Sequence, residues 1–597
     1  MNRAVLHGGV LIAFALLGSC GWAHGEADPQ TPVAPSPADA VARLLARAEE
    51  PPLFTIVLPD LHRLPSRLAQ SHLGHFVLDP NYDQGRALLL QKLNEASGTD
   101  LEALWTNLRA HIEGPVALVL SRAAPLNEGD IPGFKLRLLA SVPDAASIEA
   151  VQAAWPRLPP QSGHLLSLLR PQLYAREALS AEAAPPEWAV RIARAPGLAR
   201  VQARPRALNA ALREWATVLP ETERSGWMEA IQATAALEFE TLTLDLRTEG
   251  GQFEERLELE PLAEGGRTLT RLLRGMAAKP RPWTSLTSAL PGRQALALLF
   301  QLEPEKLSDE LPYLLQALER TVRGRKWMRT QGNSPDARDP ERFAFLTTGL
   351  SGIVGLTAQP SVTGKVDVVL AAASKDRDVE AHRLRLLKGL EALDANFLTL
   401  HQAARIGTHA PLAAQFKGPD LLPAPVIGLS EGWLWLCSTT GAYGVLTQAF
   451  ASGKTLAQDP PPFPAPREDG SYFARPEASA LRMSINLEML APLGYTSWLL
   501  SKDGPTIGDW KVPGELLPQP GLFANRMGRL ETDLWTEDGT VRGYGRGPVP
   551  LGAVLTLALV GETGRIVEIL QRPPGTVLEE LKALTQPAGG AKPEPRP

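Results

Sequence analysis

The sequence predicts an α+β protein, in which antiparallel or mixed sheets are covered by amphipathic helices. Segments with apolar residues at every second position alternate along the chain with segments whose apolar residues recur every three or four positions. These are the spacings of half-buried strands and of helices. Tight-turn sequences join neighbouring strand patterns into hairpins, which favours antiparallel pairing. We therefore expect two lobes of sheet built from strand-helix-hairpin units.

Three strand patterns run directly into a helix start that is acidic and has a proline nearby. They are residues 54–58, 296–302 and 481–487. Carboxylates suit the positive end of a helix dipole, and proline is tolerated in the first helical turn. The spacing differs among the three segments, so they resemble one another without proving a repeat.

Hairpins and long helices complete the predicted units. Residues 242–259 alternate on either side of Glu249-Gly250-Gly251, and residues 529–545 turn at Asp538-Gly539, which is a strong hairpin signal. Residues 307–322 and 384–397 each carry apolar side chains along one helical face.

The domain boundaries follow from composition. The stretch 264–282 has few apolar residues and is the expected linker between a first lobe, 51–263, and a second lobe, 283–585. Residues 586–597 are expected to form a disordered tail. Hydrophobic residues make up 44% of the 597 positions, which is enough apolar material for sizeable cores.

The first 20 residues are typical of an export signal. A positive start precedes an apolar run over residues 4–17, which is too short for a helix that spans a membrane. Leu17-Gly18-Ser19-Cys20 resembles the lipobox of bacterial lipoproteins. The resemblance implies that Cys20 is acylated and becomes the new N-terminus.

Other fates of this segment remain open. Ordinary signal peptidase cleavage after Ala23 or Gly25 is one alternative, and an uncleaved anchor is another. Gly21 stands where many inner-membrane lipoproteins carry a retention aspartate. The expected location is therefore the surface of the outer or the cytoplasmic membrane, with the periplasm or the medium if no lipid is attached. Residues 21–50 are expected to form a Pro/Ala-rich tether followed by a short helix at 38–49.

Cysteine usage and charge exclude two classes of protein. Only Cys20 and Cys437 occur, so a disulfide framework is not expected. The net charge is −5, from 60 basic and 65 acidic residues. A nucleic-acid-binding protein should carry a basic excess, so no nucleic-acid partner is expected.

A family resemblance extends over much of residues 51–560. The chain resembles a group of exported bacterial proteins that is defined only as a domain of unknown function, and the resemblance implies no activity. The residues that carry it are Asp60, Leu73-Gly74 and Asp79-Pro80 after the first strand, and residues 453–460 after a Trp-rich strand.

Gly428-Leu429-Ser430-Glu431-Gly432 fits the G-x-S-x-G pattern of a hydrolase nucleophile. That nucleophile needs a strand before the serine and a helix after it. The residues that follow, Trp433 to Cys437, have a strand pattern, so we predict a hairpin turn at Ser430.

Gly453-Lys454-Thr455 matches the end of a phosphate-binding loop. Gln448 stands where that loop requires its first glycine. The simpler prediction is a helix that ends at Gly453.

A histidine cluster is the main candidate for a metal site. His62, His72 and His75 lie close together in sequence, with Asp60 and Asp79 nearby. Structural zinc usually takes four ligands in a defined geometry, and nothing in the sequence specifies the fourth. We therefore expect a polar helix surface, with no metal and no cofactor. His401 and His409 have even fewer potential ligands near them.

Two aromatic segments allow a binding or a structural interpretation. Arg and Lys residues surround Trp327 within 320–329, and they could contact a polyanion or simply match the negative end of the preceding helix. Trp433 and Trp435 could bind sugar. A strand that is apolar on both faces is more often buried, so we expect them to pack in the core.

The function that these observations favour is binding or scaffolding in the cell envelope, without catalysis. A secreted serine hydrolase that uses Ser430 and a carrier of lipid or glycan are the alternatives. The sequence names neither the ligand nor the partner.

Overall fold

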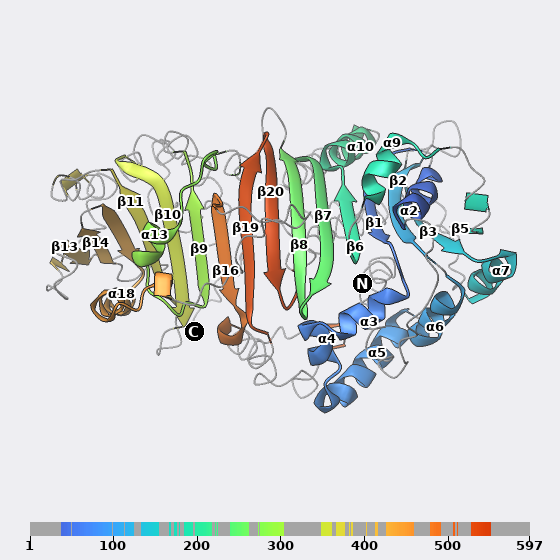
Figure 1. Ribbon diagram of the computed structural model, residues 1–597, viewed down its shortest axis with the longest axis horizontal. Helices are drawn as coiled ribbons and strands as arrows, with labels where there is room; N and C mark the ends of the chain where they lie inside the picture. Colours follow the sequence, from blue (N-terminus) through green and yellow to red (C-terminus); the bar gives the residue numbers. More distant parts are fainter. Residues whose placement is uncertain are drawn as a thin grey trace, which may run out of the picture.

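The computed structural model contains one long sheet with helices packed on both of its faces (Figure 1). This arrangement confirms the α+β prediction. The structure describes residues 37–48, 50–97, 100–112, 114–123, 133–154, 184–194, 197–217, 239–261, 275–303, 348–360, 366–375, 426–430, 432–458, 478–490 and 527–550, together with shorter stretches and single residues between them.

Neighbouring strands in the sheet are antiparallel except at β3, which β4 and β5 join in parallel. In space the order is β13-β14-β15-β11-β10-β9-β16-β19-β20-β8-β7-β6-β1-β2-β3, with β12 beside β13. The strands are β1 Phe54–Leu58, β2 Val116–Ala123, β3 Gly133–Val142, β4 Leu166–Leu168, β5 Gln172–Ala175, β6 Ala199–Ala203, β7 Phe239–Glu249, β8 Gln252–Pro261, β9 Leu296–Gln301, β10 Leu350–Pro360, β11 Val366–Ser374, β12 His401–Gln402, β13 Leu412–Gln415, β14 Val426–Ser430, β15 Trp433–Cys437, β16 Leu481–Asn486, β19 Arg529–Glu537 and β20 Thr540–Gly547, and a separate hairpin pairs β17 Thr506–Ile507 with β18 Trp510–Lys511.

The described helices lie before the first strand and between later strands. Within the described residues no helix is long and apolar enough to cross a membrane. The helices are α2 Pro37–Ala46, α3 Arg63–Ala69, α4 His72–Val77, α5 Asp83–Ser97, α6 Leu101–His111, α7 Ala145–Ala154, α9 Glu187–Ala193, α10 Pro205–Thr217, α13 Thr284–Ser288 and α18 Thr440–Ser452, with 3-10 turns at η1 Pro80–Tyr82 and η5 Leu456–Gln458.

The sheet contains the same arrangement of strands twice. In the N-terminal unit the order is β3-β2-β1-β6-β7-β8, and in the C-terminal unit it is β11-β10-β9-β16-β19-β20. Hairpins β2-β3 and β10-β11 correspond, as do β7-β8 and β19-β20. The two units join where β8 pairs with β20. Residues 264–282, the expected linker, follow β8 in the chain, and the sheet continues across the junction.

This duplication explains two of the three similar strand segments. Strands β1 and β9, from residues 54–58 and 296–302, occupy the same place in the two units. Strand β16, from 481–487, instead corresponds to β6. The sequence retains a trace of the duplication as Asp-Leu-x-Thr-Glu-x-Gly at residues 245–251 and again at 533–539.

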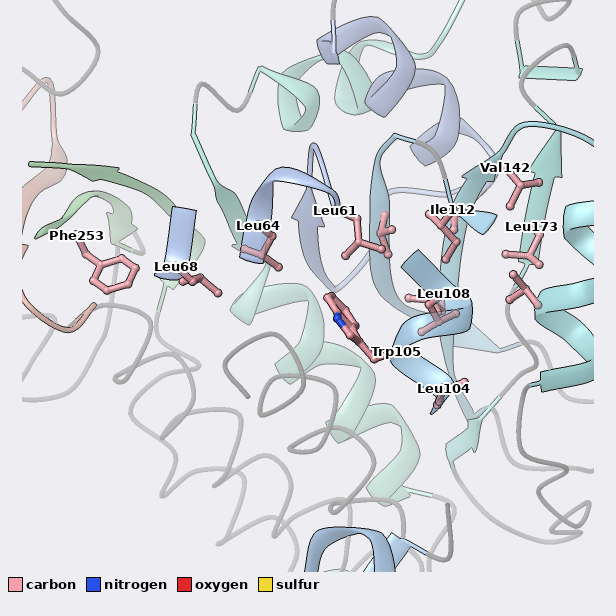
Figure 2. Close-up of a cluster of buried hydrophobic side chains, with 14 residues drawn as sticks. Leu61, Leu64, Leu68, Leu104, Trp105, Leu108, Ile112, Val142, Leu173 and Phe253 are labelled. Carbon is pink, nitrogen blue, oxygen red and sulfur yellow. The ribbon is translucent and has the colours of Figure 1, made fainter. Parts of the chain in front are cut away.

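One face of the sheet carries apolar clusters on both units. On the N-terminal unit it packs under α3 and α6, and Figure 2 shows Leu61, Leu64 and Leu68 between Phe253 and Trp105. A second cluster continues on this face across the junction into the C-terminal unit. Its buried members include Leu242, Leu259, Leu350, Val354 and Val541.

The opposite face is apolar only near the two ends of the sheet. Helices α2 and α9 cover one end, where Val41, Leu44 and Leu45 of α2 are buried against Val57 and Leu139. Helices α13 and α18 cover the other end in the corresponding places. Because successive strand residues point to opposite faces, the strands between these helix pairs present their remaining side chains on this side. Figure 1 shows these central strands without a helix drawn across them.

Candidate binding face on the central strands

A row of polar side chains crosses the central strands on the face between the two helix pairs. Each member is paired in register with the next, so all of them point to the same side of the sheet. We call this set the charged row. In spatial order it consists of Arg200 on β6, Asp245 on β7, Arg256 on β8, Tyr544 on β20, Asp533 on β19 and Arg482 on β16.

Arg200 and Asp245 form the ion pair at the N-terminal end of the row. Two parallel hydrogen bonds join them, Nε to Oδ1 at 2.6 Å and Nη2 to Oδ2 at 2.7 Å. Arg200 Nη1 also donates to the main-chain oxygens of Arg191 and Ile192 in α9, at 3.0 and 3.1 Å. The guanidinium therefore lies at the negative end of that helix, where a cation is favoured.

Asp533 and Arg482 form the corresponding pair in the C-terminal unit. Arg482 Nε donates to Asp533 Oδ1 at 2.9 Å. The same oxygen accepts from Ser479 Oγ at 2.7 Å, and Ser479 Oγ in turn accepts from Trp283 Nε1 at 3.2 Å. Asp245 and Asp533 occupy equivalent positions and are both fully buried. The two units thus share an arginine–aspartate pair whose aspartate is buried.

Further ion pairs lie beside the centre of the row, and some of their side chains are partly exposed. Tyr544 Oη donates to Glu254 Oε1 at 2.9 Å, and Arg247 also binds that carboxylate. Arg256 Nη2 lies 2.9 Å from Glu258 Oε1, with the two side chains 14% and 32% exposed.

Arg542 continues this arrangement across the junction of the two units. Its side chain is 30% exposed, its guanidinium binds Glu537, and its Nε lies 3.9 Å from Glu258 Oε1. Cations and anions therefore alternate on a partly exposed surface, which we call the central face.

The chemistry of the central face suits binding. Its carboxylates are engaged by guanidinium groups or by a tyrosine hydroxyl, an arrangement that holds side chains in place. Among the described residues, no group of three or more His, Cys, Asp and Glu side chains could hold a metal ion. Partly exposed charges of both signs, such as Glu258 and Arg542, can form ion pairs with a complementary polar surface.

Comparison with known proteins leaves the family open. No family model matches the chain, and no curated protein matches it. Two solved structures, crystal forms III and I of TP0453, align with 44% of this chain and with 77% and 76% of their own chains. Each has 9% sequence identity and a TM-score of 0.20, a level of likeness that carries no functional argument.

Ser430 lies in the hairpin that the sequence predicted. It ends β14 and is paired in register with Trp433, the first residue of β15. Gly432 between them has a φ of 79°, in the left-handed region that favours glycine. A strand follows where the hydrolase nucleophile would need a helix.

Gly453 ends α18 as predicted. Its φ of 67° is left-handed, and its N–H donates to the main-chain oxygen of Phe450. This is the usual glycine termination of a helix.

The histidine cluster and its carboxylates take part in local hydrogen bonds. His62 Nε2 is 2.9 Å from the main-chain oxygen of Ile112. Asp60 accepts from the N–H groups of His62 and Arg63, and Asp79 caps η1 by accepting from Asn81. These carboxylates satisfy free N–H groups at helix starts.

The Trp-rich strand belongs to the core, as expected. Trp435 is buried, donates from Nε1 to the main-chain oxygen of Ala289 at 3.0 Å, and lies 5.4 Å from the ring of Phe450. Trp433 is partly buried against the same cluster. Burial, and secondarily Asp367, raises the pKa of the Cys437 thiol to about 12, so this thiol stays protonated near neutral pH.

Several candidates from the sequence lie outside the described residues. They are Cys20, the basic residues around Trp327 within 320–329, and His409. The charged row itself was missed by the sequence analysis. Its signal was the repeated Asp-Leu-x-Thr-Glu-x-Gly motif, which carries both buried aspartates.

Proposed function

We propose that this protein is exported, is held on a membrane surface by lipid on Cys20, and binds or scaffolds a partner of the cell envelope through its central face. The lipobox-like segment supports the anchor. The observation that carries the binding role is the charged row together with the ion pairs beside it. The aspartates of the row are held by internal ion pairs, while Glu258 and Arg542 beside it are 32% and 30% exposed. A rigid polar surface of this kind loses little entropy on binding.

The position of α2 supports an anchored body. Its buried side chains and the bonds from Arg43 and Arg47 to the main-chain oxygens of Leu179 and Ala178 fix it to the N-terminal unit. The residues between Cys20 and Pro37 would therefore connect the lipid to a fixed point on the body. At about 3.5 Å per residue at most, they allow the central face to reach a partner away from the lipid headgroups.

The alternatives receive less support. Ser430 lies in a hairpin, so a serine hydrolase would need a geometry unlike the usual nucleophile turn. If labelling with a fluorophosphonate occurred and were lost in Ser430→Ala, it would favour the hydrolase over the binding role.

The anchor is tested with Cys20→Ser in cells, followed by membrane fractionation and intact-mass analysis. We expect the unmodified chain in the membrane fraction with acyl mass on Cys20. The variant should leave that fraction and keep its melting temperature, because the lipid packs against no core. Cys437→Ala is the matched cysteine control and should stay with the membrane. An unlipidated N-terminus at His24 or Glu26 would refute the anchor.

The binding face is tested in the same cells with a photo-crosslinking amino acid at Arg542. We expect crosslinks to an envelope component from this position. The control position is Arg63, which is 76% exposed on α3 and lies away from the central face. Equal crosslinking at both positions, or none at Arg542, would argue against this face as the binding surface.

A further inference from the structure

The junction of the two units pairs equivalent strands with each other. Strands β8 and β20 are each the last strand of their unit, and their antiparallel register places Arg256 opposite Tyr544. Arg256 is paired with Asp245 in one hairpin, and Tyr544 is paired with the corresponding Asp533 in the other, so the two positions are equivalent. A pseudo-twofold axis therefore passes through this pair, and we call the β8–β20 pairing the seam. By the same symmetry, β8 could pair in this register with β8 of a second copy.

Charge distinguishes the seam from such homotypic pairings. Glu254 and Glu258 on β8 are equivalent to Arg542 and Arg546 on β20. In the seam, Glu258 faces Arg542 and Glu254 faces Arg546. A β8–β8 pairing would place Glu254 opposite Glu258, and a β20–β20 pairing would place arginine opposite arginine. Like charges directly opposite each other destabilise a sheet.

Side-chain size also favours the β8–β20 pairing over a pairing of β8 with a second β8. Phe253, Glu255 and Leu257 on β8 face Gly547, Gly545 and Gly543 on β20. A Cβ added at Gly545 would lie 2.9 Å from Glu255 Oε2, and one added at Gly543 would lie 3.1 Å from Leu257 Cβ. Gly545 and Gly543 therefore leave room for side chains of β8, although a Cβ at Gly543 would lie still closer, at 2.6 Å, to Leu534 Cδ2 of β19. A second β8 has Leu257 and Glu255 at the equivalent positions.

We propose that the seam is a recognition interface with a code of charge and size. The acidic, bulky edge of β8 fits a basic, glycine-containing strand, and in this chain that strand is β20. The code directs the sheet to close within one molecule and rejects a second copy. Edge strands otherwise template pairing between molecules, so a protein with a sheet this long needs such discrimination.

The test uses Glu258→Arg and Arg542→Glu in the full chain, singly and together. Each single change places like charges opposite each other in the seam, and we expect Tm to fall by about 2–4 °C. The double variant restores opposite charges in the seam, so its fall in Tm should be clearly smaller than the sum of the falls in the two single variants. Each single variant also loses an ion pair outside the seam, Glu258 with Arg256 or Arg542 with Glu537. These losses occur again in the double variant, so they cancel when its change in Tm is compared with the sum of the two single changes.

The double variant also removes the charge discrimination, because in a β8–β8 pairing Glu254 of one copy would then lie opposite the arginine introduced into the other. We expect it to form more dimer than the unmodified chain after refolding at high concentration, measured by analytical ultracentrifugation. Glu260→Arg is the control, since it lies on the same face of β8 beyond the last residue paired with β20. When Glu260→Arg is combined with Arg542→Glu, the fall in Tm should equal the sum of the falls in the two single variants.

Two results would overturn the proposal: additive effects of Glu258→Arg and Arg542→Glu, or an unchanged dimer fraction in the double variant. If these variants fail to fold, the size part of the code gives a second test. Gly545→Ala should lower Tm, and adding Glu255→Ala should recover part of the loss. An equal or larger loss in that double variant would contradict the proposal.

Discussion

Arg200 and Asp245 are held together by two short hydrogen bonds in a place where the side chains are only 7% and 0% exposed. Removing charges from water is costly, and the mutual attraction offsets that cost only while both partners are present. The two main-chain acceptors in α9 take the hydrogens of Nη1. The pair therefore links β6 and β7 to a helix on the central face.

Breaking this pair from one side should destabilise the protein strongly. We expect Asp245→Ala to lower the free energy of unfolding by about 3–5 kcal/mol, because it leaves a buried guanidinium without its counter-charge. The double change Arg200→Met with Asp245→Leu should recover most of the loss. Urea denaturation measures both.

The control for this experiment is an exposed pair on the same half of the chain. Arg206 and Glu240 are 67% and 45% exposed, so Glu240→Ala should cost less than about 1 kcal/mol. A similar loss from Glu240→Ala and Asp245→Ala would contradict the role of burial.

Cys437 gives the protein a specific alkaline weakness. Burial raises the pKa of its thiol from 9.0 to about 12, so between these values the folded chain keeps a proton that the unfolded chain has lost. The free energy of unfolding should therefore fall by up to about 1.4 kcal/mol per pH unit as pH rises above 9.

Urea denaturation between pH 8 and 10 tests this weakness, and Cys437→Ala should have a flatter profile there. Tyr443 is present in both proteins. Burial first and Cys437 second raise the pKa of its hydroxyl above 10.0, so it adds a loss of the same sign that begins only at the upper end of this range. Parallel profiles for the two proteins would show that another group controls the alkaline loss.

At the scale of single elements, α18 has well-defined signals at both ends. Thr439 Oγ1 accepts from the N–H of Ala442 at 3.0 Å and donates to Asp367 Oδ1 at 2.8 Å. Gly453 ends the helix in a left-handed conformation. The helix places Tyr443 and Leu446 in the core beside Trp435. Helix capping therefore positions the cluster that covers this end of the sheet.

Removing the cap should weaken this helix. We expect Thr439→Ala to cost about 1–2 kcal/mol, since it frees an N–H at the helix start and takes a donor from the buried Asp367. Denaturation by urea and faster amide exchange in the first turn of α18 measure the effect. Thr447→Ala, in the middle of the same helix, should cost less, because alanine is the better helix former. A larger loss of stability in Thr447→Ala than in Thr439→Ala would exclude capping as the cause.

The predicted hairpins also follow local rules. Gly250 and Gly251 join β7 to β8 with φ values of 57° and 79°, and Asp538 and Gly539 join β19 to β20 with 52° and 78°. Such turns match the twist of paired strands, and only a few residue types tolerate them. For this reason both hairpins could be identified from a few residues.

At the scale of the whole molecule, the central feature is a duplicated unit joined at its own last strand. The pairing of β8 with β20 connects residues far apart in the chain, as in the bond from Tyr544 to Glu254 across 290 positions. The charged row crosses this junction, and its two arginine–aspartate pairs lie on either side of it. The proposed binding face thus exists only when both units are folded together.

Local spacing was enough to predict the α+β class, the hairpin at Ser430, the end of α18 at Gly453 and the burial of Trp435. Each depends on neighbours within a few residues, whose steric and hydrogen-bonding preferences are written in the sequence itself. The order of the strands, the duplication and the charged row required the tertiary structure. Strands that are distant in the chain pair when their faces and edges complement each other. Local periodicity depends only on neighbouring residues, so it does not predict which strands pair.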